Sequence, residues 1–249
     1  MMEKRIAVVT GGMGGIGEAI CQELFKHGVK IIATYNRGGN HESARTWQHH
    51  QKNAGYQFDI AFVDVTDFAS CESMINQIIA DVGAIDILVN NAGLSRDHTC
   101  CKMSKEEWDL VINTDLNSVF YITHAVINKM KEKNFGRIIN ISSINGQKGQ
   151  FGQVNYSAAK AGMHGFTKAL ALEVAKNGIT VNTISPGYVE TKMIQTLSEK
   201  IRNKLLDEIP MGRFATPDEV AYVVAFLASE KSNYITGANI AINGGHYML

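Results

Sequence analysis

Tyr156 and Lys160 are the two residues of this chain best suited by type and spacing to transfer a proton. They begin and end the run Tyr-Ser-Ala-Ala-Lys, and Ser143 stands thirteen residues before the tyrosine. On a helix, residues four apart lie on one face, one turn apart, so this spacing can hold an ammonium beside a phenol. We expect Tyr156 to act as general acid/base, Lys160 as its activator, and Ser143 as a hydrogen-bond donor to a substrate oxygen.

The ammonium matters because a free phenol has a pKa of about 10 and transfers protons poorly near neutrality. Lowering that pKa by about 3 units requires roughly 4 kcal/mol of preference for the phenolate. A unit charge at ~4 Å in a medium of effective dielectric constant ~20 supplies about that much. The spacing alone is common in helices, where an exposed pair without function is the alternative, so its surroundings decide the interpretation.

The chain pattern predicts a scaffold of the α/β class that positions these residues. Strand-like apolar runs alternate with helical patterns, which is typical of a doubly wound parallel sheet with helices on both faces. We predict strands over residues 5–10, 29–34, 56–63, 85–89, 137–141, 179–184 and 239–242. We predict helices over residues 15–27, 42–53, 68–82, 155–176, 193–207 and 217–228, with 105–131 forming one long helix or two joined by a kink near 113–117.

Composition and length restrict the class of protein further. The chain has no internal repeat or linker, so residues 1–249 are expected to form a single domain. Its formal net charge is zero, which gives no general attraction to nucleic acid or to an anionic membrane. The N-terminus offers no signal-peptide core, and the four cysteines show no metal-ligand spacing, so we expect a cytoplasmic protein with reduced thiols and no metal site.

A glycine-rich segment predicts a nucleotide site. Residues 10–17, Thr-Gly-Gly-Met-Gly-Gly-Ile-Gly, follow the first predicted strand and open the first helix. Glycines there permit a tight turn and a close approach to a pyrophosphate, whose charge is favoured at a helix N-terminus.

The end of the second strand selects between the two nicotinamide dinucleotides. An acid there would bind both ribose hydroxyls of NAD, whereas a basic residue would accommodate the 2′-phosphate of NADP. The chain has Tyr35-Asn36-Arg37 and no acid before Glu42, so NADP(H) is favoured. A solvated loop arginine without function is the alternative for Arg37.

Two further strand ends are expected at the same crevice, because parallel strands present their carboxyl ends together. Asp64 and Val65 follow the third strand, where a carboxylate can accept a hydrogen bond from an adenine amine. Asn91, Ala92 and Gly93 follow the fourth strand, where small residues leave room for the cofactor riboses.

Together these motifs make the chain resemble the classical short-chain dehydrogenases/reductases over essentially its whole length. The motifs are TGGMGGIG, NNAG, Ser143, YSAAK and Ser185-Pro186-Gly187, in that order. The resemblance implies a Rossmann fold and hydride transfer between NAD(P) and a carbonyl/alcohol pair, with Ser143, Tyr156 and Lys160 as catalytic residues. Thr191 matches the residue that usually contacts the nicotinamide amide. The predicted cofactor contacts are Gly11, Met13, Gly15, Ile16, Gly17, Arg37, Asp64, Val65, Asn91, Ala92, Gly93, Tyr156, Lys160, Pro186, Gly187 and Thr191.

One position departs from the family pattern. The fourth catalytic residue of the family is usually an asparagine, and Asp115 stands there in Thr-Asp-Leu-Asn-Ser-Val-Phe. In the family, the main-chain carbonyl of that residue helps to hold a water linked to the lysine, which any side chain permits. The asparagine side chain supports a helix kink, and an aspartate in its place changes the local proton balance.

Within the family, the chain is most similar to the acetoacetyl-CoA reductases of polyhydroxyalkanoate synthesis. The loop 145–153, the segment 96–103 and the ending Asn243-Gly244-Gly245-His246 carry this resemblance. A short β-keto thioester needs hydrogen-bond donors and an apolar wall. The predicted substrate contacts are Asp97, Lys102, Ser143, Gln150, Phe151, Gln153, Tyr156 and Tyr188, with Lys102 placed to meet a phosphate of CoA.

Two alternatives remain open from the sequence. One is a 3-oxoacyl-(acyl carrier protein) reductase, which predicts a basic patch beside the cleft entrance. Residues 129–133, Lys-Met-Lys-Glu-Lys, are the best candidate for it, and a solvated helix end is the alternative for this segment. The other is a non-catalytic NADP-binding sensor, suggested only by Asp115. The resemblance further implies a homotetramer.

Overall fold

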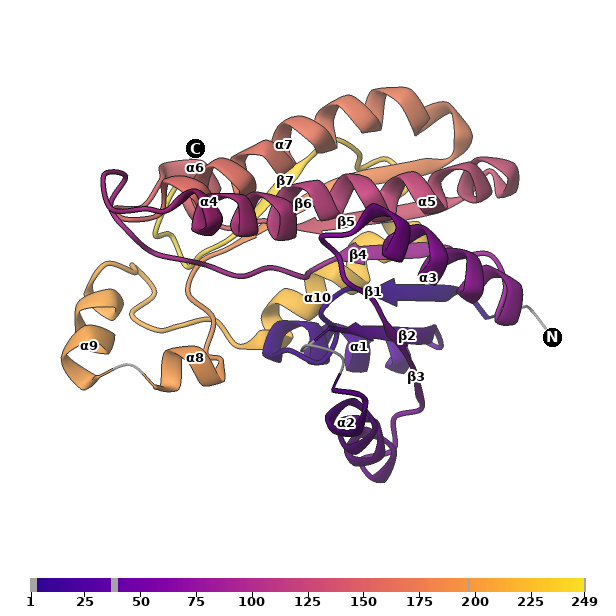
Figure 1. Cartoon of the computed structure of the whole chain (residues 1–249), viewed down its shortest axis with the longest axis horizontal. Helices are drawn as coiled ribbons and strands as arrows, with labels where there is room; N and C mark the ends of the chain where they lie inside the picture. The colour runs from indigo at the N-terminus through magenta and orange to yellow at the C-terminus, as the bar shows by residue number, and fades with distance from the viewer. Residues whose placement is uncertain (1–3, 37–39, 197, 249) are drawn as a thin grey trace.

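The computed structural model describes residues 4–36, 40–196 and 198–248 (Figure 1). The strands are β1 (Ile6–Val9), β2 (Lys30–Tyr35), β3 (Phe58–Phe62), β4 (Ile87–Asn90), β5 (Gly136–Ile141), β6 (Ile179–Pro186) and β7 (Asn239–Ile242). The α-helices are α1 (Gly15–Lys26), α2 (His41–Asn53), α3 (Phe68–Asp81), α4 (Lys105–Ile112), α5 (Ser118–Lys133), α6 (Asn145–Lys148), α7 (Val154–Val174), α8 (Lys192–Gln195), α9 (Glu199–Asp207) and α10 (Pro217–Ala228). Shorter turns are the π-helical η2 (Asn113–Asn117) and the 3₁₀-helical η3 (Ala175–Asn177) and η4 (Glu230–Ser232).

The seven strands form one sheet in the order β3-β2-β1-β4-β5-β6-β7, and every pairing is parallel. The chain builds outward from β1 to β3, then crosses to β4 on the other side of β1, so the order reverses between β1 and β4. Ligands of open α/β sheets bind at such a switch point, beyond the carboxyl ends of the strands. The predicted doubly wound Rossmann architecture is confirmed.

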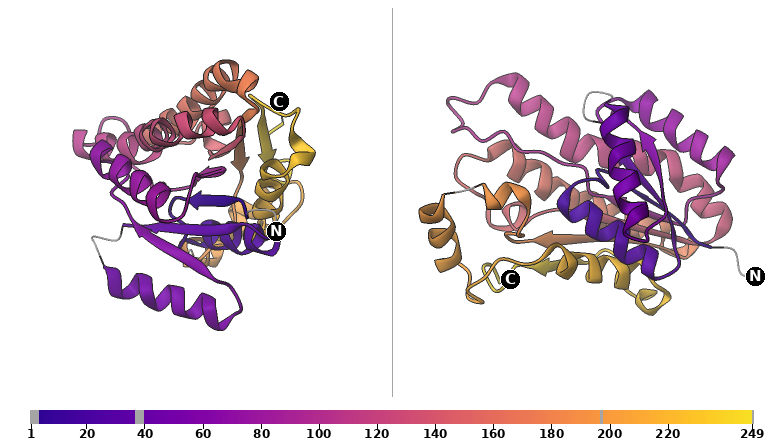
Figure 2. Two further views of the ribbon diagram at one scale, coloured as in Figure 1. Left: turned by 90° about the vertical axis from the view of Figure 1, so that its right-hand side faces the viewer. Right: turned by 90° about the horizontal axis from the view of Figure 1, so that it is seen from below.

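Helices cover both faces of the sheet (Figure 2). The strands are buried on both sides and therefore read as nearly continuous apolar runs, as in Ile-Ala-Val-Val of β1. Consecutive residues of β1 point to opposite faces. Val9 lies in the core cluster that includes Leu24 of α1 and Val224 of α10, whereas Val8 lies in the cluster with Ile122 of α5. Within the described ranges, no helix is long and apolar enough to cross a membrane.

Most predicted elements are confirmed to within one or two residues, and the kink near 113–117 is one of them. The helix from Lys105 changes there to the π-helical turn η2 and resumes as α5. Two predictions were wrong. The single polar helix expected over 193–207 is the two helices α8 and α9, and the segment after Ser143, expected to be a loop, begins with the one-turn helix α6.

A chain of buried polar side chains ties the central strands to α7. The Asn90 amide donates to Asn140 Oδ1 at 2.8 Å, and the Asn140 amide donates to Thr167 Oγ1 at 2.8 Å. Thr167 in turn shares a 2.7 Å hydrogen bond with Thr183 of β6. All four residues are buried, so each polar group depends on its partner for a hydrogen bond.

We predict that Asn140→Leu lowers the free energy of unfolding by about 2–4 kcal/mol, because it leaves the Asn90 amide and the Thr167 hydroxyl without this buried partner. Urea denaturation with linear extrapolation measures the change. Asn53→Leu, at the exposed end of α2, is the matched control and is expected to stay within about 0.5 kcal/mol of the parent protein. Equal stability of the two variants would contradict the prediction.

Candidate active site

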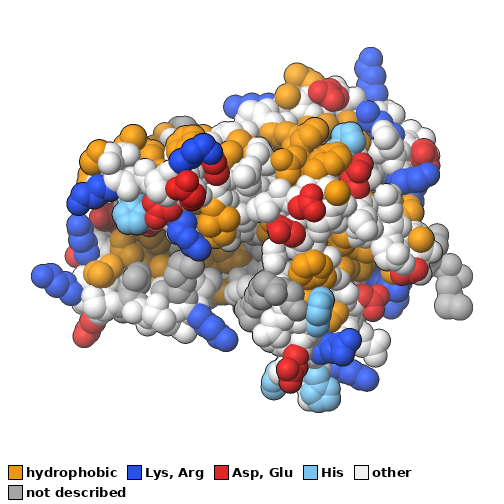
Figure 3. All heavy atoms as spheres, in the orientation of Figure 1, with side chains coloured by type: hydrophobic (Ala, Val, Ile, Leu, Met, Phe, Trp, Pro, Cys, Tyr) orange, Lys and Arg blue, Asp and Glu red, His pale blue; other side chains and the backbone are white. Residues whose placement is uncertain are grey.

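The predicted catalytic residues meet at the carboxyl edge of the sheet. The β1 arrow in Figure 1 points toward this edge, where α8, α9 and the ends of α4 and α6 lie. The space-filling view is hollowed on this side, with hydrophobic side chains in the floor of the hollow (Figure 3). Ser143 stands two residues after the end of β5 and is 8% exposed, and its Oγ accepts a hydrogen bond from the Asn145 N–H at 3.1 Å.

Helix α7 carries the other two catalytic candidates. Tyr156 and Lys160 lie one turn apart, and Lys160 Nζ is 5.4 Å from the centroid of the Tyr156 ring. Close packing holds α7 against the end of β5. Lys160 Nζ donates to the Ile141 carbonyl at 3.0 Å, and Ser142 Oγ donates to the Lys160 carbonyl at 2.8 Å. The sequence spacing therefore does produce an ammonium beside a phenol.

Asn155 fixes the start of this helix against the neighbouring loop. Its buried side chain donates to the Arg96 carbonyl at 3.0 Å and accepts from the Tyr156 N–H at 2.8 Å. Gly146 of α6 packs against the same helix, since a Cβ there would lie 2.7 Å from the Lys160 carbonyl carbon. The loop after β4, α6 and the catalytic turn of α7 are thus held as one unit.

Asp115 joins the catalytic pair through its side chain. Its Oδ2 lies 3.1 Å from Lys160 Nζ, and its Oδ1 accepts a hydrogen bond from the Leu94 N–H at 2.9 Å. The family pattern implies that the side chain at this position supports the helix kink. In this structure the Asp115 side chain also contacts Lys160 and Leu94. The predicted cofactor residue Gly93 lies over the pair, because a Cβ there would come within 2.7 Å of Asp115 Oδ2 and 3.2 Å of Lys160 Nζ.

In the buried Asp115–Lys160 pair, the cost of burying each charge opposes the attraction between the two charges. Burial disfavours the ammonium, but the electrostatic interactions of Lys160 with Asp115, and then with Tyr156, outweigh it, so the pKa of Lys160 is raised above its usual value. Burial also raises the pKa of the Asp115 carboxyl, against the opposing attraction of Lys160 and the hydrogen bond from Leu94.

The glycine-rich turn is shaped for close backbone approach. Gly11 has φ of +59°, and a Cβ on Gly17 would lie 2.4 Å from the Gly11 carbonyl oxygen. Helix α1 begins after Gly14, which supplies no side-chain cap, so its first N–H groups point out of the helix without a capping side chain. Gly15 packs against the Thr191 side chain, with 3.2 Å between its would-be Cβ and Thr191 Cγ2. These features fit a dinucleotide whose pyrophosphate lies at the helix N-terminus.

The other predicted cofactor residues lie along the same edge. Thr10 Oγ1 accepts hydrogen bonds from the N–H groups of Asn91 and Ala92, both at 2.9 Å, which fixes the loop after β4 to the glycine-rich turn. Pro186 ends β6, and the Gly187 N–H donates a hydrogen bond to the Ile242 carbonyl of β7.

The adenosine end of the predicted cofactor site is only partly described. Asp64 Oδ1 accepts hydrogen bonds from the N–H and the hydroxyl of Thr66, and Val65 is buried. Met13 and Ile16 are partly exposed beside the turn. Arg37, on which the NADP prediction rests, lies outside the described residues.

The predicted substrate residues divide into two groups. Gln153 bridges Asp97 and Asn145, donating to Asp97 Oδ2 and accepting from Asn145 Nδ2, both at 2.8 Å. The structure thus brings the loop after β4 to the loop after α6, as the substrate prediction requires. Lys102, Gln150 and Phe151 are instead exposed, and Phe151 is 88% exposed at the loop tip.

Tyr188 packs in a cluster that sequence reasoning missed. Its ring stacks on His246 with centroids 5.8 Å apart, and His246 Nε2 lies 2.9 Å from Lys148 Nζ and 3.4 Å from Glu208 Oε2. Burial, then Glu208 and Asp97, raise the pKa of Tyr188. The ending Gly-Gly-His indicates only a family likeness, and no local pattern in it predicts that His246 contacts Tyr188.

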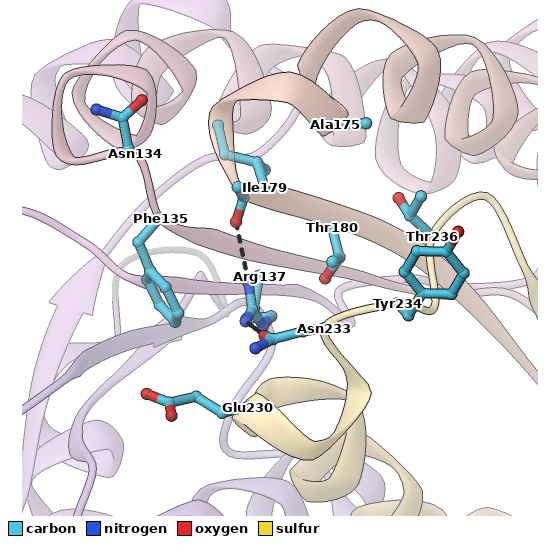
Figure 4. Close-up of a pocket in the computed structure, with 11 residues that line it drawn as sticks. Asn134, Phe135, Arg137, Ala175, Ile179, Thr180, Glu230, Asn233, Tyr234 and Thr236 are labelled. Carbon is cyan, nitrogen blue, oxygen red and sulfur yellow. Dashed lines mark hydrogen bonds between the residues drawn. The ribbon is translucent and has the colours of Figure 1, made fainter.

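A cavity of about 640 Å³ lies at the opposite edge of the sheet, near the amino ends of β5 and β6 (Figure 4). Arg137 points into its wall, where it donates to carbonyl groups and to Asn233 and lies over the Phe135 ring. None of the predicted site residues lines this cavity. We therefore place the candidate active site at the carboxyl edge.

Comparison with known proteins gives matches over almost the whole chain. A family profile described as enoyl-(acyl carrier protein) reductase matches residues 11–247. The chain is 54% identical to the acetoacetyl-CoA reductase of Allochromatium vinosum, with 98% of this chain and 99% of that protein aligned. It is 48% identical to the acetoacetyl-CoA reductase of Cupriavidus necator (99% and 100% aligned) and 44% identical to the 3-oxoacyl-[acyl-carrier-protein] reductase FabG of Escherichia coli (99% of each).

We predict that Gly93→Ala reduces turnover about 100-fold, because the added methyl group would displace Asp115 and Lys160 from their contact. Steady-state kinetics with a nicotinamide cofactor and a carbonyl substrate measures the loss. Gly165→Ala on α7 is the control, since a Cβ there meets nothing within 4 Å, and it is expected to keep full turnover. An equally active Gly93→Ala enzyme would show that the close packing at position 93 has no catalytic consequence.

Proposed function

The chain belongs to the short-chain dehydrogenase/reductase family and is an oxidoreductase of the 3-oxoacyl type that uses a nicotinamide cofactor; on that premise we propose that it reduces acetoacetyl-CoA to (R)-3-hydroxybutyryl-CoA with NADPH. The observation that carries the proposal is the placement of Lys160 5.4 Å from the Tyr156 ring and in contact with Ile141, two residues before Ser143, at the edge of the sheet that holds the glycine-rich turn. The choice of NADPH depends on Arg37 and on the lack of an acid at the end of β2.

The bound cofactor supplies a hydride to the C3 carbon of the keto group. Tyr156 donates its proton to the oxygen as the alkoxide forms, and Ser143 donates a hydrogen bond to the same oxygen. Lys160 places a positive charge beside the phenol. The Lys160 ammonium donates one hydrogen bond to the Ile141 carbonyl and lies 3.1 Å from Asp115 Oδ2, and we propose that another of its N–H groups meets a ribose hydroxyl of the cofactor.

The thioester assignment draws on the loops that border the site. Gln153, Asp97 and Asn145 join the two loops into one wall, and Tyr188 supplies an aromatic surface held by His246. A wall with polar groups and one aromatic face suits a short β-keto thioester. The identities to two acetoacetyl-CoA reductases, 54% and 48%, exceed the 44% identity to the carrier-protein enzyme and support the CoA ester.

The carrier-protein alternative requires a basic patch beside the cleft, and the candidate segment for this patch lies elsewhere. The basic segment at residues 129–133 is not beside the cleft, because it ends α5 immediately before the amino end of β5. Two of its lysines are also paired: Lys129 with Glu132 at 2.7 Å, and Lys133 with Asp86. A non-catalytic NADP-binding sensor remains the alternative from another class, and cofactor binding without turnover would identify it.

We also propose a cytoplasmic homotetramer. Exposed apolar side chains on α4, α5 and α7, namely Trp108, Phe120 and Leu172, offer surface for association. The four cysteines are unpaired, as expected in a reducing compartment.

We predict that Tyr156→Phe lowers kcat for acetoacetyl-CoA reduction by about 100- to 10,000-fold, because it removes the proton donor and keeps the ring. NADPH oxidation, followed optically, gives kcat. Cofactor affinity, measured by fluorescence titration, is expected to stay within a few-fold of the parent protein. Full activity of this variant would eliminate the proposed proton transfer.

A second prediction concerns the acyl carrier. We expect a higher kcat/KM with acetoacetyl-CoA than with acetoacetyl-carrier protein, and a higher kcat/KM with NADPH than with NADH. Competitive inhibition by free CoA would agree with the CoA ester. Preference for the carrier-protein ester would instead assign the chain to fatty-acid synthesis.

A further inference from the structure

Asp115 is the one acidic side chain in contact with the catalytic lysine among the described residues. It is fully buried at η2, and the Lys160 side chain is 4% exposed. We propose that Asp115 is the counter-ion of Lys160 and keeps the Lys160–Tyr156 pair as ammonium beside phenol at a higher pH than the pair would maintain alone. Asp115 acts through Lys160 and is therefore a positioning residue. The inference rests on the proposed function, in which Tyr156 donates the proton.

The surrounding packing restricts Asp115 to this partner. One carboxylate oxygen is held by the Leu94 N–H at 2.9 Å, which directs the other oxygen toward Lys160 Nζ. Gly93 leaves no room for a side chain between the loop after β4 and the ion pair. A buried carboxylate in this position is strongly disfavoured without a cation, so the two charges stabilise each other.

The groups that face the pair set its local charge. Lys160 interacts with Asp115 and Tyr156, and Asp115 interacts with Lys160. The contacts from β5 and from the loop after β4 are the neutral Ile141 carbonyl and Leu94 N–H. His164, one turn further along α7, faces the hydroxyls of Ser142 and Ser185, and burial lowers its pKa, so it is neutral at alkaline pH.

This arrangement makes the active protonation state electrically neutral. Phenol, ammonium and carboxylate sum to zero, whereas an asparagine at position 115 would leave a net positive charge in a buried site. An unpaired buried ammonium loses its proton more readily, and it also draws the proton from the adjacent phenol more strongly. Both effects lower the pH at which the ammonium-beside-phenol state is lost, and the proposed reduction needs that state.

The test is Asp115→Asn in the full-length protein. Asparagine has the same shape and retains an acceptor for the Leu94 N–H, so the fold is expected to persist. We expect the midpoint of the alkaline limb of kcat for reduction to fall by about 3 pH units, the size of a unit-charge effect at ~4 Å in a medium of effective dielectric constant ~20. A loss of kcat by the same factor at every pH, with an unchanged midpoint, would show a structural role and overturn the proposal.

Asp109→Asn is the matched control. It removes the same charge from the neighbouring helix α4, where Asp109 pairs with Lys105 at the surface. Its pH profile is expected to coincide with that of the parent protein. An equal shift in this variant would mean that net charge alone moves the profile, which would also overturn the proposal.

A second measurement does not depend on turnover. In protein labelled with ¹³C at lysine Cε, the signal missing from Lys160→Met reports the protonation of Lys160. We expect it to titrate about 3 pH units lower in Asp115→Asn than in the parent protein. An unchanged titration would refute the counter-ion role. If neither thioester is reduced, the proposed function fails, and this titration alone still decides the inference.

Discussion

Parallel pairing of β1, β4, β5 and β6 is the constraint on which the rest of the molecule depends. The register aligns Val9 with Val89, Asn90 with Asn140, and Ile141 with Ile184, so the carboxyl ends of these strands lie on one edge. Residues separated by more than a hundred positions in the sequence, such as those of the glycine-rich turn and Lys160, therefore border one cleft. The buried chain from Asn90 to Thr183 reinforces the register, because a shift would separate its polar groups from their partners.

The second constraint is the burial of a lysine. An ammonium removed from water needs compensating contacts, and Lys160 obtains them from the Ile141 carbonyl and the Asp115 carboxylate. These contacts come from β5 and η2, so the catalytic turn of α7 is oriented by the two elements that flank it. The π-helical turn at 113–117 belongs to the same arrangement, since the ion-pair partner Asp115 lies within it.

Loops that border the cleft are organised by contacts between distant segments. Gln153 links two loops through its amide, and His246 stacks on Tyr188 while it lies between Lys148 and Glu208. Three separate stretches of chain thus form the wall next to Tyr188. The geometry explains how His246 comes to lie beside Tyr188, although the two residues are far apart in the sequence.

Periodicity was enough to predict the seven strands, the major helices and the kink before α5, because each depends on local patterns. Motif spacing also predicted that Tyr156 and Lys160 lie one turn apart on a helix, as they do on α7. Local patterns did not predict α6, which is a single turn, or the division between α8 and α9. Residues 129–133 form the largely exposed end of α5, which is the alternative to a basic patch beside the cleft, because a helix that leads into a parallel strand ends at the amino edge of the sheet.

The sequence by itself therefore determined the fold class and the presence of aspartate at position 115, and it predicted Ser143, Tyr156 and Lys160 as the catalytic residues. Only the tertiary structure decided that this aspartate faces Lys160 and that His246 supports Tyr188. The physical reason is that both contacts join elements far apart in the chain, and they form only when packing of the sheet and its helices brings those elements together.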